Sequence, residues 1–169
     1  MDGLAHTVKV IYHGYHWRIK MRKLLYLLLF LGACILSACS YDSETAAKNG
    51  DVINMHGPVY NFPRFERFLD NIDAKERASV RITNYTLQGD PTLYNLSFDG
   101  SLFDLEIDRS KNKDRGDSPA KVNISCSELV SEEGQQLFTY TLEGCQPDPT
   151  IKSFTILSIM KEQVEDHEH

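Results

Sequence analysis

The sequence is poor in the residues from which strong catalytic and metal-binding motifs are built. It has only four cysteines and six histidines among 169 residues, and no two cysteines have the CxxC spacing of a redox motif. No serine is flanked by glycines as a nucleophile for a histidine to activate. We therefore expect no enzyme, no cofactor and no metal site.

Basic side chains are also in short supply. The sequence has 18 Lys and Arg against 24 Asp and Glu, which gives a net charge of −6. Nucleic-acid binding depends on a basic face that neutralises phosphates. We therefore expect no nucleic-acid partner.

Long apolar runs are absent except at residues 24–38, which follow Arg22 and Lys23. Fifteen helical residues span about 22 Å, which is shorter than the ~30 Å hydrocarbon core of a bilayer. The two cations favour retention of the preceding end on the cytoplasmic side. The arrangement is typical of a cleaved signal peptide, here residues 21–38.

The end of this run predicts lipidation. Leu36, Ser37, Ala38 and Cys39 resemble the bacterial lipobox, in which small residues precede a cysteine. We expect cleavage between Ala38 and Cys39 and a diacylglyceryl anchor on the Cys39 thiol, since two acyl chains anchor stably. Cys34 is a second candidate, but its apolar core would have only about seven residues. A plain membrane anchor with both cysteines as bystanders is the other alternative.

The remaining chain divides by composition. Residues 1–20 are interpreted as an extension from a start assigned too early, with Met21 as the true start, or as a long cytoplasmic n-region. Residues 39–50 are polar and predict a flexible tether. Residues 51–164 predict a single domain, and 165–169 predict a disordered tail.

Removal of residues 1–38 leaves 131 residues, enough for one domain with a real core. Five of the 18 cations and one of the 24 acidic residues are lost with them, so the net charge becomes −10. An acidic domain is repelled by anionic lipid heads. The lipid must then provide the attachment to the membrane.

Cys126 and Cys145 are the two cysteines that follow the anchor. An even pair in an oxidising compartment indicates one disulfide, with two reduced and buried thiols as the alternative. Such a bond would stabilise the fold by roughly 3 kcal/mol through loop-closure entropy.

Apolar periodicity predicts one helix followed by strands. A helix is expected over 62–73, with Asn61 as its N-cap, and its apolar face consists of Phe65, Phe68, Leu69 and Ile72. Strands are expected over 79–88, 92–99, 101–108, 120–126 and 136–144. The Asp99-Gly100 pair predicts a two-residue hairpin.

Three segments leave alternatives open. Residues 51–55 are a first strand or an extended lead-in, and 127–134 are a turn or a short helix. Residues 152–164 are a strand or a helix. The order predicts an α+β fold in which the helix packs on an antiparallel β-meander of about five strands.

Several segments together resemble a known family. They are 49–52 with 56–57, then 64–68, 80–83 with 85–86, 89–91, 98–100, Cys126 and 142–145. The set is similar to an uncharacterised family (a domain of unknown function) of small exported lipoproteins from spore-forming Gram-positive bacteria. The resemblance implies a monoderm cell envelope and a tethered domain that faces the wall. It brings no catalytic residues.

Two groups of oxygen-bearing side chains favour a solvated surface over a site. Residues 108, 110, 112 and 114 alternate like a calcium loop, but Lys113 and Pro119 occupy the places of the required glycine and glutamate. Asp104, Glu106 and Asp108 are expected to point outward from one strand, where a raised pKa is not expected.

Arg81, Tyr85 and Asp90 form the polar, aromatic corner that we predict as a ligand or partner surface. The alternative is turn chemistry combined with strand packing. His56 lies in a Gly-Pro turn and is interpreted as a surface histidine.

The combined prediction is a non-enzymatic binding or accessory domain, lipid-anchored to the extracytoplasmic face of the bacterial cell membrane. Its candidate partners are an envelope protein or a wall polymer. An inhibitor of an extracytoplasmic protease or lytic enzyme is the alternative. A tethered hydrolase using His56 and Asp90 is a third hypothesis.

Overall fold

The structure is a computed structural model that describes residues 41–146 and 152–165. The predicted signal peptide, the cleavage site at Ala38 and Cys39, residues 1–20 and most of the predicted tail lie outside the described residues. None of the helices in the described part of the chain has the length and apolar character needed to cross a membrane.

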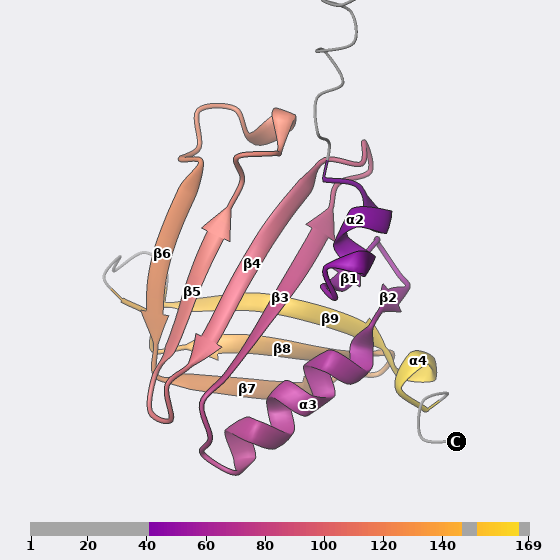
Figure 1. Ribbon diagram of the computed structural model, residues 1–169. Helices are drawn as coiled ribbons and strands as arrows, with labels where there is room; N and C mark the ends of the chain where they lie inside the picture. Colours follow the sequence, from indigo (N-terminus) through magenta and orange to yellow (C-terminus); the bar gives the residue numbers. More distant parts are fainter. Residues whose placement is uncertain (1–40, 147–151, 166–169) are drawn as a thin grey trace, which may run out of the picture. The chain divides into compact units, whose positions relative to one another are not determined.

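The fold is α+β and contains two sheets. The larger, mixed sheet has the order β2-β1-β3-β4-β5-β6, and the smaller, antiparallel sheet has the order β7-β8-β9. The large sheet consists of β1 (Val52–Asn54), β2 (Val59–Tyr60), β3 (Ala78–Tyr85), β4 (Pro91–Phe98), β5 (Phe103–Asp108) and β6 (Lys121–Cys126). The small sheet consists of β7 (Glu128–Glu133), β8 (Leu137–Glu143) and β9 (Ser153–Met160). Figure 1 shows the small sheet running across the strands of the large one.

The prediction of a single five-strand meander was therefore wrong in its topology. Strands β3 to β6 do form an antiparallel meander. Strand β1 extends it by pairing parallel to β3, however, and the predicted fifth strand, β8, belongs to the second sheet. Alternation along each strand shows which face is apolar but does not show which neighbour covers it.

The core lies between the sheets and is closed by helix α3 (Phe62–Asp73), whose bounds confirm the prediction. Phe62, Phe65 and Phe68 of this helix are all at most 2% exposed. The Phe65 ring meets the Tyr140 ring of β8 edge-on, with 4.8 Å between the centroids. The helix thus contributes to the same core as the small sheet.

Asn61 precedes α3 but does not cap it as predicted. Its backbone is left-handed, with φ of 58°, and its side chain accepts no capping hydrogen bond. Instead its Nδ2 donates to the Asp51 carbonyl oxygen at 2.9 Å. Asparagine tolerates this conformation better than most residues, so Asn61 shapes the entry into α3 and fastens it to the start of β1.

Two local predictions were wrong. Residues 128–133 form strand β7, where a turn or short helix was expected. The strand is at the edge of the small sheet and its side chains are mostly exposed, so it lacks a clear alternating pattern. The Asp99-Gly100 turn is also longer than two residues, since Phe98 pairs with Phe103 and the Asp99 carboxylate accepts from Ser101 and Leu102 backbone N–H groups.

Both alternatives for the C-terminal segment are present. Residues 153–160 form β9, and α4 (Lys161–Glu165) follows at once. A β-bulge shifts the register of β9 against β8 between Tyr140 and Thr141. The two adjacent residues Ile156 and Leu157 are consequently both buried, at 1% exposure.

The predicted tether over 39–50 contains a helix, α2 (Ser43–Lys48). The Asp42 side chain caps it by accepting from the Thr45 backbone N–H at 2.8 Å. Ala46 is fully buried in a small cluster with Ile53 and Tyr85. From residue 41 onward the segment is therefore part of the folded domain, and only residues 39 and 40 of the predicted tether lie outside the described residues.

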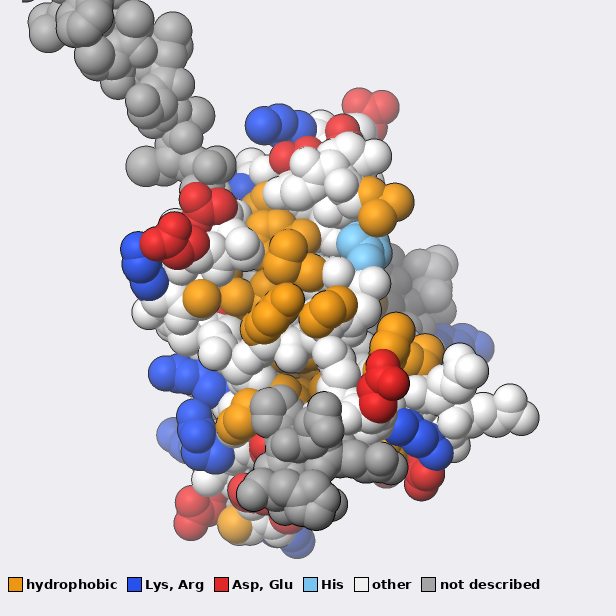
Figure 2. Space-filling view, turned by 90° about the vertical axis from the view of Figure 1, so that its right-hand side faces the viewer, with side chains coloured by type: hydrophobic (Ala, Val, Ile, Leu, Met, Phe, Trp, Pro, Cys, Tyr) orange, Lys and Arg blue, Asp and Glu red, His pale blue; other side chains and the backbone are white. Residues whose placement is uncertain are grey.

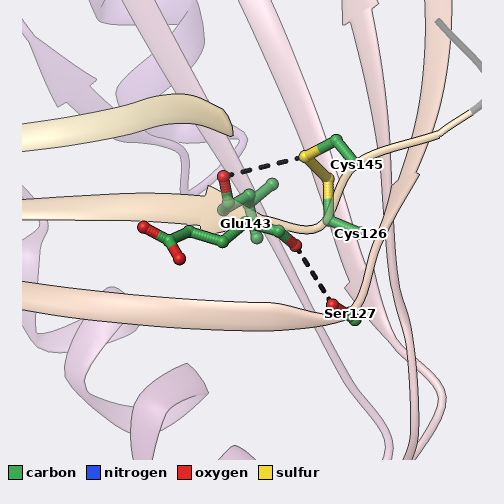
Figure 3. The surroundings of a disulfide bond; sticks show 5 residues. Cys126, Ser127, Glu143 and Cys145 are labelled. Atoms are coloured by element: carbon green, nitrogen blue, oxygen red, sulfur yellow. Dashed lines mark hydrogen bonds between the residues drawn. A yellow bond between two sulfur atoms is a disulfide. The ribbon is translucent and has the colours of Figure 1, made fainter. Parts of the chain in front are cut away.

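The disulfide between Cys126 and Cys145 is confirmed. It joins Cys126, the last residue of β6 in the large sheet, to Cys145, which follows β8 and Gly144 (Figure 3). The Ser127 backbone N–H donates to the Glu143 carbonyl oxygen at 3.0 Å beside it. Gly144 has φ of +63°, and a Cβ there would lie 2.2 Å from the Ser127 Oγ, so this junction requires glycine.

Candidate ligand cavity

One face of the large sheet is polar, because alternate side chains of β3 to β6 point away from the core. The register aligns Arg81, Asn95, Glu106 and Asn123 across the four strands. The neighbouring row is Ser79, Ser97, Asp104 and Ser125. These rows provide charged groups, amides and hydroxyls instead of apolar contacts.

A cavity of about 570 Å³ lies where this polar face meets α3 and the turn into β1. Figure 1 shows α3 alongside the first half of β3. Strand β1 pairs only with residues 82–84 of β3, so it leaves the preceding part of that edge uncovered. The polar lining consists of Asn49, Asp51, Arg64, Arg67, Asn71, Ser79, Arg81, Asn95 and Ser97.

Asp51 is the buried centre of the wall of this cavity, with 1% exposure. One of its carboxylate oxygens accepts from Arg81 Nε at 2.7 Å. The other accepts from the Thr83 hydroxyl at 2.7 Å and the Tyr41 hydroxyl at 2.5 Å. A buried carboxylate requires such partners to offset its desolvation, so Asp51 is fully occupied by structural bonds.

Arg81 joins the cavity to the N-terminal segment. Its guanidinium lies over the Tyr41 ring, 5.7 Å from the centroid, in a cation–π contact. The Tyr41 hydroxyl also accepts from Asn49 Nδ2 at 3.1 Å. These contacts fix the position of Arg81 without burying it, since its side chain remains 35% exposed.

Arg64 and Arg67 lie on one side of α3 and are both exposed. Neither guanidinium has a hydrogen bond or an ion pair within the described ranges 41–146 and 152–165. The Arg64 guanidinium rests on Gly50, where φ is +75° and a Cβ would lie only 2.5 Å from the Arg64 Cζ. Glycine at position 50 is therefore what allows Arg64 to lie against the cavity wall.

The three residues predicted as a ligand surface have different surroundings. Arg81 lines the cavity. Tyr85 is only 7% exposed, and its hydroxyl donates to the Tyr41 carbonyl oxygen at 3.1 Å. Burial, together with nearby Tyr41 and acidic groups, raises the pKa of Tyr85 to about 12. Asp90 lies in the β3–β4 turn, outside the cavity lining, with Lys113 at 3.9 Å.

Sequence reasoning missed Arg64, Arg67 and Asp51 as cavity residues. The arginines recur three residues apart and so share one side of a helix turn. The periodic phenylalanines drew attention to the opposite, apolar side. A helical projection would have placed the arginines together, but it would not have shown that Arg81 and Asp51 meet them.

Two of the three carboxylates on β5 are less exposed than predicted and form salt bridges. Asp104 is exposed, while Glu106 and Asp108 are half-buried and both pair with Lys121, at 3.2 and 3.1 Å. Partial burial works to raise the pKa of Asp108, but hydrogen bonds from Ser110 and Lys121 outweigh it and the pKa lies below its usual value. A lowered pKa suits a salt bridge and does not suit a general acid.

The other predicted candidates are accounted for by local structure. His56 is exposed in the β1–β2 turn, where its φ is 54°. In the loop after Asp108, Asn112 accepts from the Asp114 backbone N–H, which begins a short 3₁₀ turn at Lys113–Arg115. Among the residues that the structure describes, no three His, Cys, Asp or Glu come together as a metal site.

The family model that matches this chain covers residues 49–141 and is described as a domain of unknown function (DUF4362). The chain belongs to this family. No curated protein and no solved structure matches it. All residues that line the cavity fall within the matched range, whereas the predicted signal peptide and Cys39 precede it.

The DUF4362 domain thus combines a buried carboxylate with three guanidiniums around one recess. Segments far apart in sequence, at residues 49–51, 64–71, 79–81 and 95–97, meet there. Chemically, such a recess can bind and orient an anionic group.

Proposed function

We propose that the chain is a lipid-anchored, non-enzymatic binding protein on the extracytoplasmic face of the bacterial cell membrane. The observation that carries the binding role is the cavity in which the Arg64 and Arg67 guanidiniums have neither a hydrogen bond nor an ion pair in the described part of the chain. Exposed cations beside a preformed recess favour a ligand whose anionic group pairs with them. The lipobox-like residues 36–39 support the anchor.

The proposed anchor would hold the domain close to the bilayer. Only Ser40 separates Cys39 from Tyr41. Tyr41 is itself fastened to Asp51 and to Tyr85 by hydrogen bonds of 2.5 and 3.1 Å. Two extended residues reach about 7 Å, so the attachment leaves little free chain between lipid and domain.

Crosslinking on intact cells tests this function. The native, lipidated protein is crosslinked and the captured material is identified by mass spectrometry, in parallel with an Arg64→Ala/Arg67→Ala variant. We expect a recurrent captured partner or wall fragment that is lost in the variant. Equal capture by both proteins would remove the cavity from the function, and a mature chain that retains residues 24–38 would contradict the anchor.

The alternative, an inhibitor-like domain, is favoured by one feature of the surface. Met55, Tyr60 and Met160 are exposed at 41%, 53% and 39%. Figure 2 shows apolar side chains gathered on the side of the molecule that carries α2, β1, β2 and α4. Exposed apolar patches mark protein contacts in many proteins. Inhibition assays against extracytoplasmic proteases and lytic enzymes, with Tyr60→Ser as the variant, separate this function from the first.

A further inference from the structure

We propose that the arginine-lined cavity binds the phosphate group of a hydroxyl-bearing ligand. The inference deepens the proposed function and rests on it, because it names the ligand class of the same cavity. It depends on charge balance, on the geometry of the guanidiniums and on the neutral part of the lining.

The charges that line the cavity do not balance. Three guanidiniums line the cavity against a single carboxylate, so its formal charge is +2. The carboxylate is Asp51, whose oxygens already accept from Arg81, Thr83 and Tyr41. This excess of positive charge lies in a chain with a net charge of −6. A doubly charged anion would neutralise it.

The positions of the guanidiniums favour a bound phosphate over loosely associated counterions. Arginine presents a planar fork of donors that matches phosphate oxygens. Arg64 is seated on Gly50, and Arg81 is held by its Nε bond to Asp51 at 2.7 Å. Two of the three guanidiniums are thus positioned before any ligand arrives, which lowers the entropic cost of binding.

The neutral lining indicates the rest of the ligand. Asn71, Ser79, Asn95 and Ser97 add amide and hydroxyl groups to the wall. These groups suit the hydroxyls of a sugar or polyol phosphate. The volume of about 570 Å³ is that of an ordinary small-molecule site.

The test is titration of the full chain in a non-ionic detergent with inorganic phosphate, glycerol 3-phosphate and acetate. We expect both phosphates to bind at least tenfold more tightly than acetate. Because each arginine is expected to donate charge-assisted hydrogen bonds to the phosphate, Arg64→Ala and Arg67→Ala should each weaken phosphate binding by about tenfold or more.

Two further variants sharpen the result. Arg77→Ala removes an equal charge outside the cavity lining and should leave the affinity unchanged. Gly50→Ala keeps all three guanidiniums but displaces that of Arg64, so it should also weaken binding. Thermal unfolding of each variant shows whether it is folded.

The inference is overturned if the folded wild-type chain binds neither phosphate, or if Arg77→Ala weakens binding as much as Arg64→Ala. Cavity-dependent capture in the crosslinking experiment would then preserve the binding function with another ligand class. The source of the phosphate is resolved by reconstitution in phosphatidylcholine vesicles with and without phosphatidylglycerol. Weaker glycerol 3-phosphate binding with phosphatidylglycerol present supports a lipid headgroup, and unchanged binding supports a non-lipid ligand.

Discussion

At the scale of single residues, Asp51 does most to define the cavity. Its side chain connects the N-terminal segment, through Tyr41, to β3, through Arg81 and Thr83. Its backbone carbonyl receives the Asn61 side chain at the entry to α3. One buried carboxylate thus holds three parts of the chain around one point.

Replacement of Asp51 by alanine should be strongly destabilising. The change leaves the Arg81 guanidinium, which is 35% exposed, and two hydroxyls without their acceptor. Breaking a buried charged pair typically costs 3–5 kcal/mol, and because Arg81 is partly exposed we expect a loss at the lower end of this range, about 3 kcal/mol, in urea unfolding. The exposed Asp104, replaced by alanine as a control, should change stability by no more than about 0.5 kcal/mol.

The raised pKa of Tyr85 predicts that the folded chain loses stability at alkaline pH. Burial raises its pKa to about 12 in the folded chain, above the ordinary value of 10.0. Its stabilisation is therefore complete below pH 10 and is lost as the pH rises toward 12, by about 2–3 kcal/mol. Urea unfolding from pH 8 to 12 measures the decline, and Tyr85→Phe should make it shallower. An equally steep decline in Tyr85→Phe would show that other groups cause it.

At the scale of elements, the chain passes from the large sheet to the small sheet through a very short connection. Only Ser127 separates β6 of the large sheet from β7 of the small one. The disulfide from Cys126 to Cys145 closes the same junction from the end of β8. The bond therefore ties the two sheets together where the chain passes between them.

Removal of the disulfide should cost about 2–5 kcal/mol of stability. A Cys126→Ala/Cys145→Ala variant keeps the junction small and avoids an unpaired thiol. Its denaturation midpoint, compared with that of the oxidised wild type, measures the loss. Identical midpoints would mean that packing between the sheets holds the junction without the bond.

Helix α2 was not predicted, because the sequence gives little local sign of it. Its composition is that of a polar linker, and Ala46 is its one buried residue. The helix is stabilised by the Asp42 cap, by the Lys48–Glu44 ion pair and by attachment through Tyr41. Tertiary contacts hold in place a segment that has too little apolar surface to fold alone.

At the scale of the whole molecule, the arrangement is an acidic domain with one cationic recess. The net charge of the chain is −6, and yet three arginines from α3 and β3 converge on a single cavity. Bringing like charges together destabilises the folded state unless a bound partner neutralises them. This conflict between stability and local charge supports a binding role.

The proposed anchor gives a clear prediction for the intact protein. A Cys39→Ser variant should leave the membrane fraction or retain its signal peptide, because the acceptor thiol is lost. Cys34→Ser is the matched control and should remain lipidated and membrane-bound. Fractionation with mass spectrometry of the N-terminus measures both. Release by Cys34→Ser instead would move the lipidation site to the upstream cysteine.

Prediction of elements succeeded where one face of an element is buried. Alternation along 103–108 and the phenylalanine spacing of α3 identified a strand and a helix, because each repeats its apolar residues with its own period. Strand β7 failed this test because it is an exposed edge. Of the arginines that line the cavity, the predicted ligand corner included Arg81 but not Arg64 and Arg67.

Local patterns in the sequence were enough to predict the α+β class, the main helix and the strands of the meander, and they favoured a disulfide between Cys126 and Cys145. Each of these depends on local periodicity, or on the prediction that Cys34 and Cys39 belong to a signal peptide, which leaves two cysteines to pair. The three-dimensional fold was needed to show that the strands divide into two sheets, that residues 41–50 pack against β3 and that three arginines share a cavity. These features depend on contacts between residues far apart in sequence, and a local pattern carries no information about which surfaces will meet.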